Sequence, residues 1–261
     1  MTSTLQPSSR SVQPATSTAA WDEPEGVAAR GTVVVLTGRG ESAAAYGRLG
    51  RRISADAYRV RVVELDLDDL GGAREAVRDL LVDPDLPGPR VLLGTDTGAT
   101  FGAVLAEGGQ HALDGVVLAG LALPGASGAP AGDWDAELET RTACPAHRRV
   151  LDADPAFTRG SLRRDLPAAW DGYVPTPSGL PTLVLHGSDD PLTPVEAALA
   201  PFRGAPLVHT HVVEGGRHDV LNDVSHRSVA ATVVLFLERL RLGADLPVVV
   251  RDEGRTPSGT P

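Results

Sequence analysis

Several residue types are scarce or absent in this sequence, and each gap narrows what the protein can be. Only one cysteine is present, Cys144, so no disulfide can form within the chain and no thiolate cluster can hold a metal. No apolar run approaches the roughly 20 residues that a membrane helix needs. Lysine is missing, and all 24 basic residues are arginine. We expect a protein of the reducing cytoplasm, with no disulfide, no metal and no segment inserted in a membrane.

Positive charge is also in short supply, because 34 acidic residues outnumber the basic ones and give a net charge of −10. An acidic surface repels a phosphate backbone, which argues against nucleic acid as a partner. The bias toward arginine, alanine and glycine is typical of a GC-rich bacterial genome. A chain of 261 residues with 42% hydrophobic residues suits one α/β domain with a small insertion.

Short β-branched runs alternate with alanine-rich stretches, a pattern typical of a mostly parallel sheet with helices on both faces. The composition predicts a disordered tail over residues 1–27, a domain over residues 28–243 and a loose tail over residues 244–261. The predicted strands cover residues 32–37, 59–65, 91–94, 115–119, 182–186 and 208–213, and the predicted helices cover residues 43–54, 73–81, 99–107, 195–200 and 225–242.

One interval, residues 124–179, interrupts this alternation and contains no convincing strand. It is dense in Asp, Arg and Pro, and we expect a short helical lid over the sheet. Its polar and aromatic side chains would supply N–H or O–H donors to a substrate, although each could equally plug the core. The candidate substrate-binding residues are Trp134, His147, Trp170 and Tyr173.

A sharp turn between a strand and a helix is the strongest chemical signal. The apolar run at residues 91–93 leads into Gly-Thr-Asp-Thr-Gly at residues 94–98, and the small-residue stretch ATFGAVLA follows. A nucleophile elbow, G-x-S-x-G, requires glycine two residues on either side of its central residue, because neighbouring backbones approach closely there. Here the central residue is Asp96. A helix N-cap is the alternative role for this aspartate, but a cap does not require the two glycines.

Four motifs together resemble the α/β-hydrolase superfamily, in the style of bacterial lysophospholipases and monoacylglycerol lipases. The first is LTGRGES at residues 36–42, similar to the family's turn after its first strand except for Thr37 in place of histidine, and the second is the elbow. The resemblance implies an α/β-hydrolase fold and an oxyanion hole built from backbone N–H groups. The corresponding donors are Arg39 or Gly40, together with Thr97.

The other two motifs resemble the acid and histidine turns of the family. LVLHGSDDPLTP at residues 183–194 places Asp190 as the acid, with Asp189 as its neighbour and alternative, and VVEGGRHDVLND at residues 212–223 places His218 as the catalytic histidine. The order nucleophile, acid, histidine is the order the family requires. The resemblance therefore implies a catalytic triad of Asp96, His218 and Asp190.

An aspartate nucleophile changes the expected chemistry. A carboxylate is ionised at neutral pH and attacks carbonyls poorly, but it can displace a leaving group at an sp³ carbon and form an enzyme ester. His218 would then activate water, with Asp190 orienting the imidazole. This logic resembles the haloalkane dehalogenase and epoxide hydrolase branches. Thr97 stands where the dehalogenases carry tryptophan, and the insertion contains one tyrosine, Tyr173, where epoxide hydrolases offer two.

Three functions remain open from the sequence. The first is a hydrolase of a small organic substrate that forms a covalent alkyl- or acyl-enzyme at Asp96. The second is a non-hydrolytic lyase or cyclase of secondary metabolism in which Asp96 and His218 act as acid and base. The third is a catalytically silent, ligand-binding homologue. No cofactor is expected in any of them. An apolar patch on the insertion would allow a homodimer, although no spacing in the sequence supports one.

Overall fold

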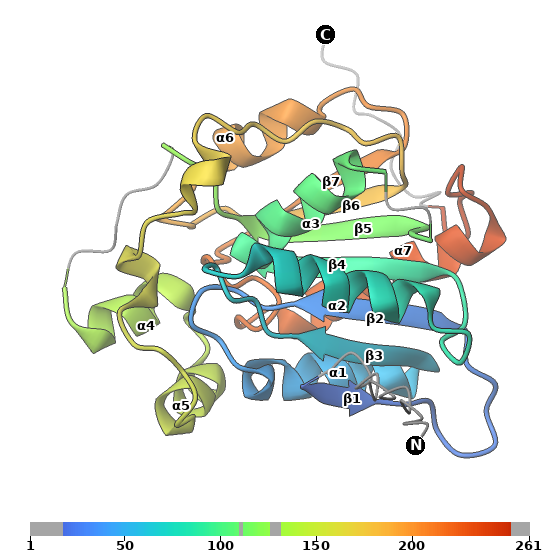
Figure 1. Cartoon of the computed structure of the whole chain (residues 1–261), viewed down its shortest axis with the longest axis horizontal. Helices are drawn as coiled ribbons and strands as arrows, with labels where there is room; N and C mark the ends of the chain where they lie inside the picture. The colour runs from blue at the N-terminus through green and yellow to red at the C-terminus, as the bar shows by residue number, and fades with distance from the viewer. Residues whose placement is uncertain (1–17, 110–111, 126–131, 252–261) are drawn as a thin grey trace, which may run out of the picture.

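A seven-stranded sheet, parallel except at one edge, forms the centre of the molecule (Figure 1). The computed structural model describes residues 18–109, 112–125 and 132–251. The central strands are continuous apolar runs, as expected for strands that helices cover on both faces. The spatial order is β1-β3-β2-β4-β5-β6-β7. The strands are β1 (Ala19–Trp21), β2 (Gly31–Leu36), β3 (Tyr58–Val63), β4 (Arg90–Asp96), β5 (Gly115–Leu121), β6 (Thr182–Gly187) and β7 (Val208–Val213).

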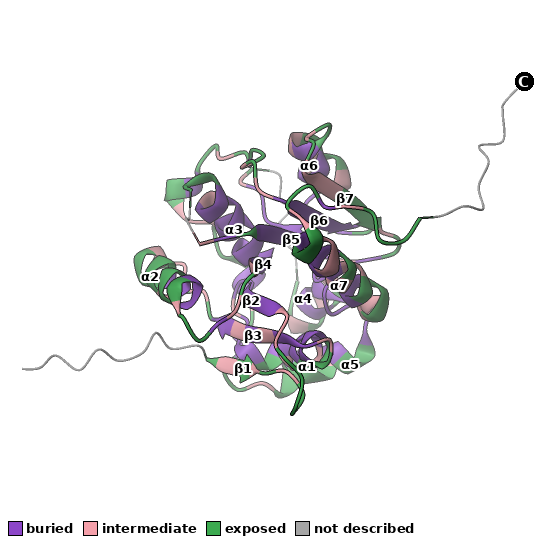
Figure 2. Cartoon of the chain, turned by 90° about the vertical axis from the view of Figure 1, so that its right-hand side faces the viewer, coloured by how far each residue is buried: buried purple, intermediate pink, exposed green. Residues whose placement is uncertain are grey.

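Helices pack on both faces of the sheet and divide its core in two (Figure 2). On one face, α1 (Gly47–Ala55) and α7 (His226–Leu242) bury side chains such as Ile53 and Leu237. On the other face, α2 (Leu70–Val82), α3 (Thr97–Glu107) and α6 (Val195–Leu199) bury side chains such as Val77 and Phe101. Short 3₁₀ turns, η1 (Ala43–Tyr46) and η4 (Ala200–Phe202), adjoin α1 and α6. The α/β architecture predicted from the sequence is confirmed.

The ordered domain extends into both segments that were expected to be tails. β1 lies within residues 1–27 and pairs antiparallel with β3, and the Trp21 ring packs close to Gly50 of α1. At the other end, the buried side chain of Leu246 belongs to the core, and its carbonyl accepts a hydrogen bond from Arg239 Nε (3.0 Å). In each segment one large apolar side chain, Trp21 or Leu246, packs against the domain, and its burial fixes the nearby chain although the composition of the segment predicts disorder. Residues 1–17 and 252–261 lie outside the described part.

The insertion, residues 124–179, contains no strand within its described residues 124–125 and 132–179. Its helices are α4 (Trp134–Arg141), α5 (Pro145–Ala153), η2 (Ser161–Arg163) and η3 (Ala168–Trp170), and in Figure 1 α4 and α5 lie together beside the sheet. Asp133 caps α4 by accepting a hydrogen bond from Ala136 N (3.2 Å). Among the helices of the described residues, none is both long and apolar enough to cross a bilayer.

Candidate active site

Asp96 lies at a sharp turn between β4 and α3, with backbone angles of φ 51° and ψ −122°. A left-handed conformation is strained for a residue with a Cβ and persists only where the surroundings enforce it. The flanking glycines allow the close approach, because a Cβ on Gly94 would lie 2.2 Å from the Gly98 carbonyl oxygen, and one on Gly98 would lie 2.4 Å from the Leu36 oxygen. Asp96 precedes α3 without capping it by a side-chain hydrogen bond. Its carboxylate points instead toward Arg39 and His218.

Three side chains that are distant in the sequence meet at the carboxyl ends of the parallel strands. His218, in the turn after β7, lies with Nε2 3.0 Å from Asp96 Oδ1. Its Nδ1 lies 2.9 Å from Oδ2 of Asp190, which follows β6. The Asp190 Oδ1 accepts hydrogen bonds from the backbone N–H groups of Leu192 (2.8 Å) and Thr193 (3.3 Å), which fix the carboxylate. The imidazole therefore connects two carboxylates in a line.

The charges of Asp96, His218 and Asp190 shift the pKa of each of these three groups. Burial opposes the protonated form of His218, but the carboxylates of Asp190 and Asp96 outweigh it and raise the pKa of His218 to about 10. Burial also opposes the ionised form of Asp96, but the Arg39 charge and the hydrogen bond from His218 hold its pKa well below the usual range. Burial likewise opposes the ionised form of Asp190, but the contacts with His218 and His186 outweigh it and lower the pKa of Asp190. At neutral pH an imidazolium lies between two carboxylates.

Arg39 covers the remaining faces of the Asp96 carboxylate. Its backbone N–H donates to Oδ2 (2.7 Å), and its guanidinium donates from Nε to Oδ2 (3.0 Å) and from Nη2 to Oδ1 (2.8 Å). Both partners are almost fully buried, with 5% of the Arg39 side chain and 2% of the Asp96 side chain exposed. The remaining guanidinium nitrogen, Nη1, donates to the carbonyls of Leu162 (3.1 Å) and Arg164 (3.3 Å) in the insertion. Arg39 thus separates Asp96 from solvent.

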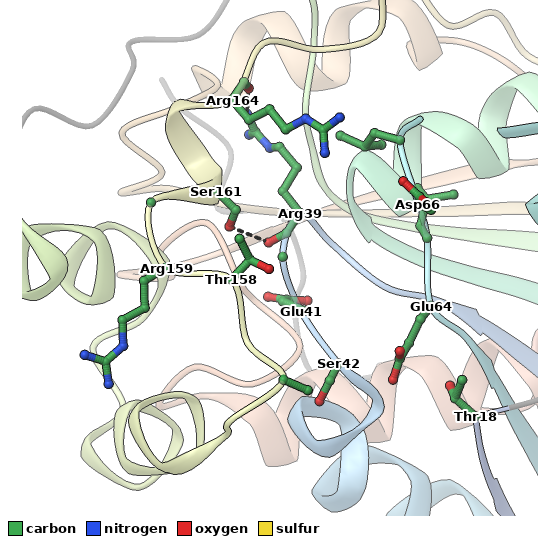
Figure 3. A pocket seen from close by; sticks show the side chains of 15 residues that line it. Thr18, Arg39, Glu41, Ser42, Glu64, Asp66, Thr158, Arg159, Ser161 and Arg164 are labelled. Carbon is green, nitrogen blue, oxygen red and sulfur yellow. Dashed lines mark hydrogen bonds between the residues drawn. The ribbon is translucent and has the colours of Figure 1, made fainter. Parts of the chain in front are cut away.

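Two cavities meet at Arg39. The first has a volume of about 630 Å³ and lies between the turn after β2, the turn after β3 and the insertion (Figure 3). Figure 3 shows Arg39 between Ser161 and Arg164, with the Ser161 hydroxyl donating to the Arg39 carbonyl (2.9 Å). The second cavity, of about 450 Å³, lies against residues 123–125 and the segment around Leu166. A small organic molecule in either cavity would contact Arg39 before Asp96.

The predicted lid donors are engaged elsewhere, and none of them lines these two cavities in the described part of the chain. Trp134 Nε1 donates to Asp152 (2.9 Å), and Tyr173 Oη donates to Glu107 (2.7 Å). His147 Nε2 lies 2.7 Å from Asp219 in a buried pair. Trp170 stacks on Phe101 of α3, with ring centroids 6.3 Å apart. These four side chains hold the insertion to the domain and to itself.

The predicted oxyanion-hole residues are placed differently from one another. Among the described residues, the backbone N–H of Arg39 donates to the Asp96 side chain, and no such hydrogen bond joins Asp96 to the backbone N–H of Gly40 or Thr97. Gly40 has φ +69°, and a Cβ there would lie 2.3 Å from Ser161 Oγ, so this glycine packs against the insertion. Thr97 begins α3 and is fully buried. Within the same described part, no group of three or more His, Cys, Asp or Glu side chains could hold a metal ion.

Two groups of the site were not predicted from the sequence. The Arg39 guanidinium was not expected, because the turn motif assigns a role only to the backbone of that residue. His186 is not among the predicted site residues, yet its Nε2 lies 3.1 Å from Asp190 Oδ2 and 2.7 Å from the Thr193 carbonyl. Its position, next to last in β6 and four residues before Asp190, is a signal that could have identified it.

Comparison with solved structures finds many similar folds at low sequence identity. A monoacylglycerol lipase from Paleococcus ferrophilus is 18% identical, with a TM-score of 0.66 over 86% of this chain and 97% of its own. A soluble variant of monoglyceride lipase from Saccharomyces cerevisiae is 16% identical, with a TM-score of 0.67 over 85% and 90%. An esterase from Rhodococcus sp. is 19% identical, with a TM-score of 0.61 over 85% and 94%.

No family model matches the sequence, and no curated protein does. Sequence identities below 20% are evidence for the fold and for nothing further. All three neighbours have this fold, and each alignment covers most of both chains. The chain has the α/β-hydrolase fold that its sequence motifs predict.

Proposed function

We propose that this protein is a hydrolase of a small organic substrate and uses Asp96 as a covalent nucleophile. The observation that carries the proposal is the line of three groups in which His218 Nε2 lies 3.0 Å from Asp96 Oδ1 and Nδ1 lies 2.9 Å from Asp190. Asp96 lies in a strained turn between a strand and a helix, and a nucleophile on such a turn is typical of α/β-hydrolases, which supports the proposal. The structural neighbours named as lipases and an esterase support hydrolysis as the class of reaction.

The reaction proceeds in two steps. Oδ1 of Asp96 attacks an sp³ carbon of the substrate, the bond from that carbon to the leaving group breaks, and the leaving group departs with the electron pair. The Nε2 proton of the His218 imidazolium passes to the leaving group or to solvent, which leaves the imidazole neutral. The product is an ester between the substrate and Asp96. His218 then accepts a proton from water, the water oxygen attacks Cγ of the ester, and an alcohol is released that carries Oδ1. Asp190 keeps the imidazole in place, and the regenerated carboxylate contains one oxygen from water.

Trapping the ester tests this proposal. His218→Gln removes the base for the second step, so the variant incubated with haloalkanes, epoxides and esters should accumulate a covalent adduct on the peptide that contains Asp96. In the wild type, ¹⁸O from labelled water should enter the Asp96 carboxylate during turnover. His211→Gln is a matched control, because His211 is exposed on β7, and it should turn over substrate without an adduct. A wild type that turns over substrate with neither adduct nor label in any arm would contradict the proposal.

A second candidate function is binding without catalysis. The observation that favours it is the Arg39 guanidinium, which donates to both oxygens of Asp96 and so opposes nucleophilic attack. The same experiment separates the two candidates. Saturable binding of a compound with no turnover, no adduct and no label would favour the binding protein.

A further inference from the structure

Two donors of a single residue converge on one oxygen of Asp96. The Arg39 backbone N–H lies 2.7 Å from Oδ2, and Nε of the same side chain lies 3.0 Å from it. Among the described residues, both hydrogen bonds recorded to Oδ2 come from Arg39, whereas His218 faces the other oxygen, Oδ1. The two oxygens therefore have different surroundings. Oδ1 faces the base as well as Nε and Nη2 of the guanidinium, whereas Oδ2 faces the backbone N–H and Nε of Arg39.

Arg39 is fixed by hydrogen bonds at its backbone carbonyl and at the far end of its side chain. Its backbone carbonyl accepts hydrogen bonds from Arg141 Nη2 (2.9 Å) and from Ser161 Oγ (2.9 Å). Its Nη1 donates to the carbonyls of Leu162 and Arg164. These four contacts all come from the insertion, and none of them involves Asp96. The guanidinium therefore has a position of its own that persists when Asp96 changes its charge.

The two steps of the proposed reaction make opposite demands on this cation. In the first step, Oδ1 must exchange its contacts with Nε and Nη2 for the substrate carbon, and the cation stabilises the carboxylate that must react. In the second step, water attacks Cγ and the electron pair of the Cγ–Oδ2 π bond moves onto Oδ2. Negative charge then develops at the oxygen that both Arg39 donors already face. Preorganised donors at a developing charge are a large source of catalysis in a buried site.

We propose that the Arg39 guanidinium is a catalytic group for the second step, where it stabilises the oxyanion on Oδ2 together with the backbone N–H of the same residue. This inference rests on the proposed function. It assigns to the side chain a role that the fold ordinarily leaves to backbone donors. It also gives a reason for a cation that hinders attack by Asp96, because the same cation stabilises the oxyanion when the ester is hydrolysed.

Single-turnover kinetics with detection of the adduct by intact mass spectrometry tests the role of Arg39. Arg39→Met keeps an unbranched side chain of somewhat shorter length and removes its donors and its charge. We expect the rate constant for hydrolysis of the ester to fall about 100-fold, as for the loss of one oxyanion-hole donor. Formation of the ester should not slow, because the substitution removes the cation that hinders attack by Asp96, so this variant should accumulate the adduct. Arg203→Met is the matched control, because this exposed arginine pairs with Glu196 far from the site.

Arg39→Lys is the second variant and decides the matter if Arg39→Met does not fold. Lysine keeps the charge but loses the Nε donor, so hydrolysis should slow by about 10-fold and the adduct should again accumulate. The inference is overturned if His218→Gln accumulates adduct while the folded Arg39 variants do not, or if both steps slow equally. If His218→Gln accumulates no adduct with any substrate, the proposed function itself fails. These two failures are therefore distinguishable.

Discussion

Two buried networks of charge share the backbone of Arg39 but are arranged for different tasks. We call Asp96, Arg39, His218 and Asp190 the Asp96 network. The Arg141 network consists of Arg141, Glu41, Glu137, Tyr46 and Ser161. Arg141 Nη1 lies 3.1 Å from Glu41 and Nη2 lies 3.0 Å from Glu137, with all three side chains at most 2% exposed.

The difference lies in what the groups face. In the Arg141 network a cation lies between two carboxylates and ties α4 to the turn after β2, and Glu41 also accepts a hydrogen bond from the backbone of Gly38 (3.1 Å). In the Asp96 network a histidine lies between two carboxylates, and the adjoining cation borders two cavities. Burial and charge are common to both networks. Both also border the first cavity, the Arg141 network through Glu41 and Ser161. The proposed nucleophile and the proposed base lie in the Asp96 network, and this difference supports its assignment as the reactive one.

Asp190→Asn should have the largest effect, and on the reaction rather than on the fold. An amide at this position disturbs the charge and tautomer of His218, and the corresponding change in a catalytic triad lowers kcat by about 10⁴-fold. Steady-state kinetics on a substrate identified in the trapping experiment measures this loss. A kcat within 10-fold of the wild type would remove Asp190 from the catalytic machinery and erase the distinction between the two networks.

Arg141→Met should weaken the fold more than any change at the surface. The substitution leaves Glu41 and Glu137 as buried carboxylates without their cation, and breaking such a pair costs about 3–5 kcal/mol in the free energy of unfolding. Urea denaturation followed by circular dichroism measures the change. A variant as stable as the wild type but inactive would show that Arg141 serves the site, and the two networks would then be one.

The pH dependence of stability should single out the Asp96 network. Because the pKa of His218 is raised to about 10, its protonated form stabilises the folded state fully below pH 6.5, and this contribution is lost as the pH rises through about 10. The difference in unfolding free energy between wild type and His218→Gln should therefore shrink by up to about 1.4 kcal/mol per pH unit over this interval. Denaturant titrations at pH 6, 8 and 10 test the sign. A constant difference would mean that His218 does not titrate there.

The smallest effect is expected at the exposed pair of Arg203 and Glu196. Solvent screens an ion pair at the surface, so Arg203→Met should leave the denaturation midpoint and the kinetics unchanged. The comparison with Arg141→Met is direct, because the two substitutions are chemically identical, whereas Arg141 is buried between two carboxylates and Arg203 is exposed beside one. Equal losses of stability would show that burial is not what distinguishes the Arg141 network.

Most of the sheet could be predicted because its strands are apolar runs bounded by turn residues, as at β2, where all six residues are buried. The Asp96 turn could be predicted because two glycines mark a close backbone approach in the sequence itself. β1 could not be predicted, because three residues are too few to show an alternating pattern and Trp21 is anchored only by its packing against α1. The side chain of Arg39 could not either, because its direction depends on carbonyls about 120 residues away in the insertion.

His218 lies between two carboxylates, and this arrangement gives the proposed reaction its timing. While Asp96 is a free carboxylate, its charge and that of Asp190 raise the pKa of His218 to about 10, and an imidazolium cannot take a proton from water. Formation of the ester removes the charge of Asp96, so one of the two carboxylates that stabilise the imidazolium is gone and the imidazole becomes a stronger acid. The intermediate thereby releases its own base. In the proposed reaction, water is therefore activated only when there is an ester to hydrolyse.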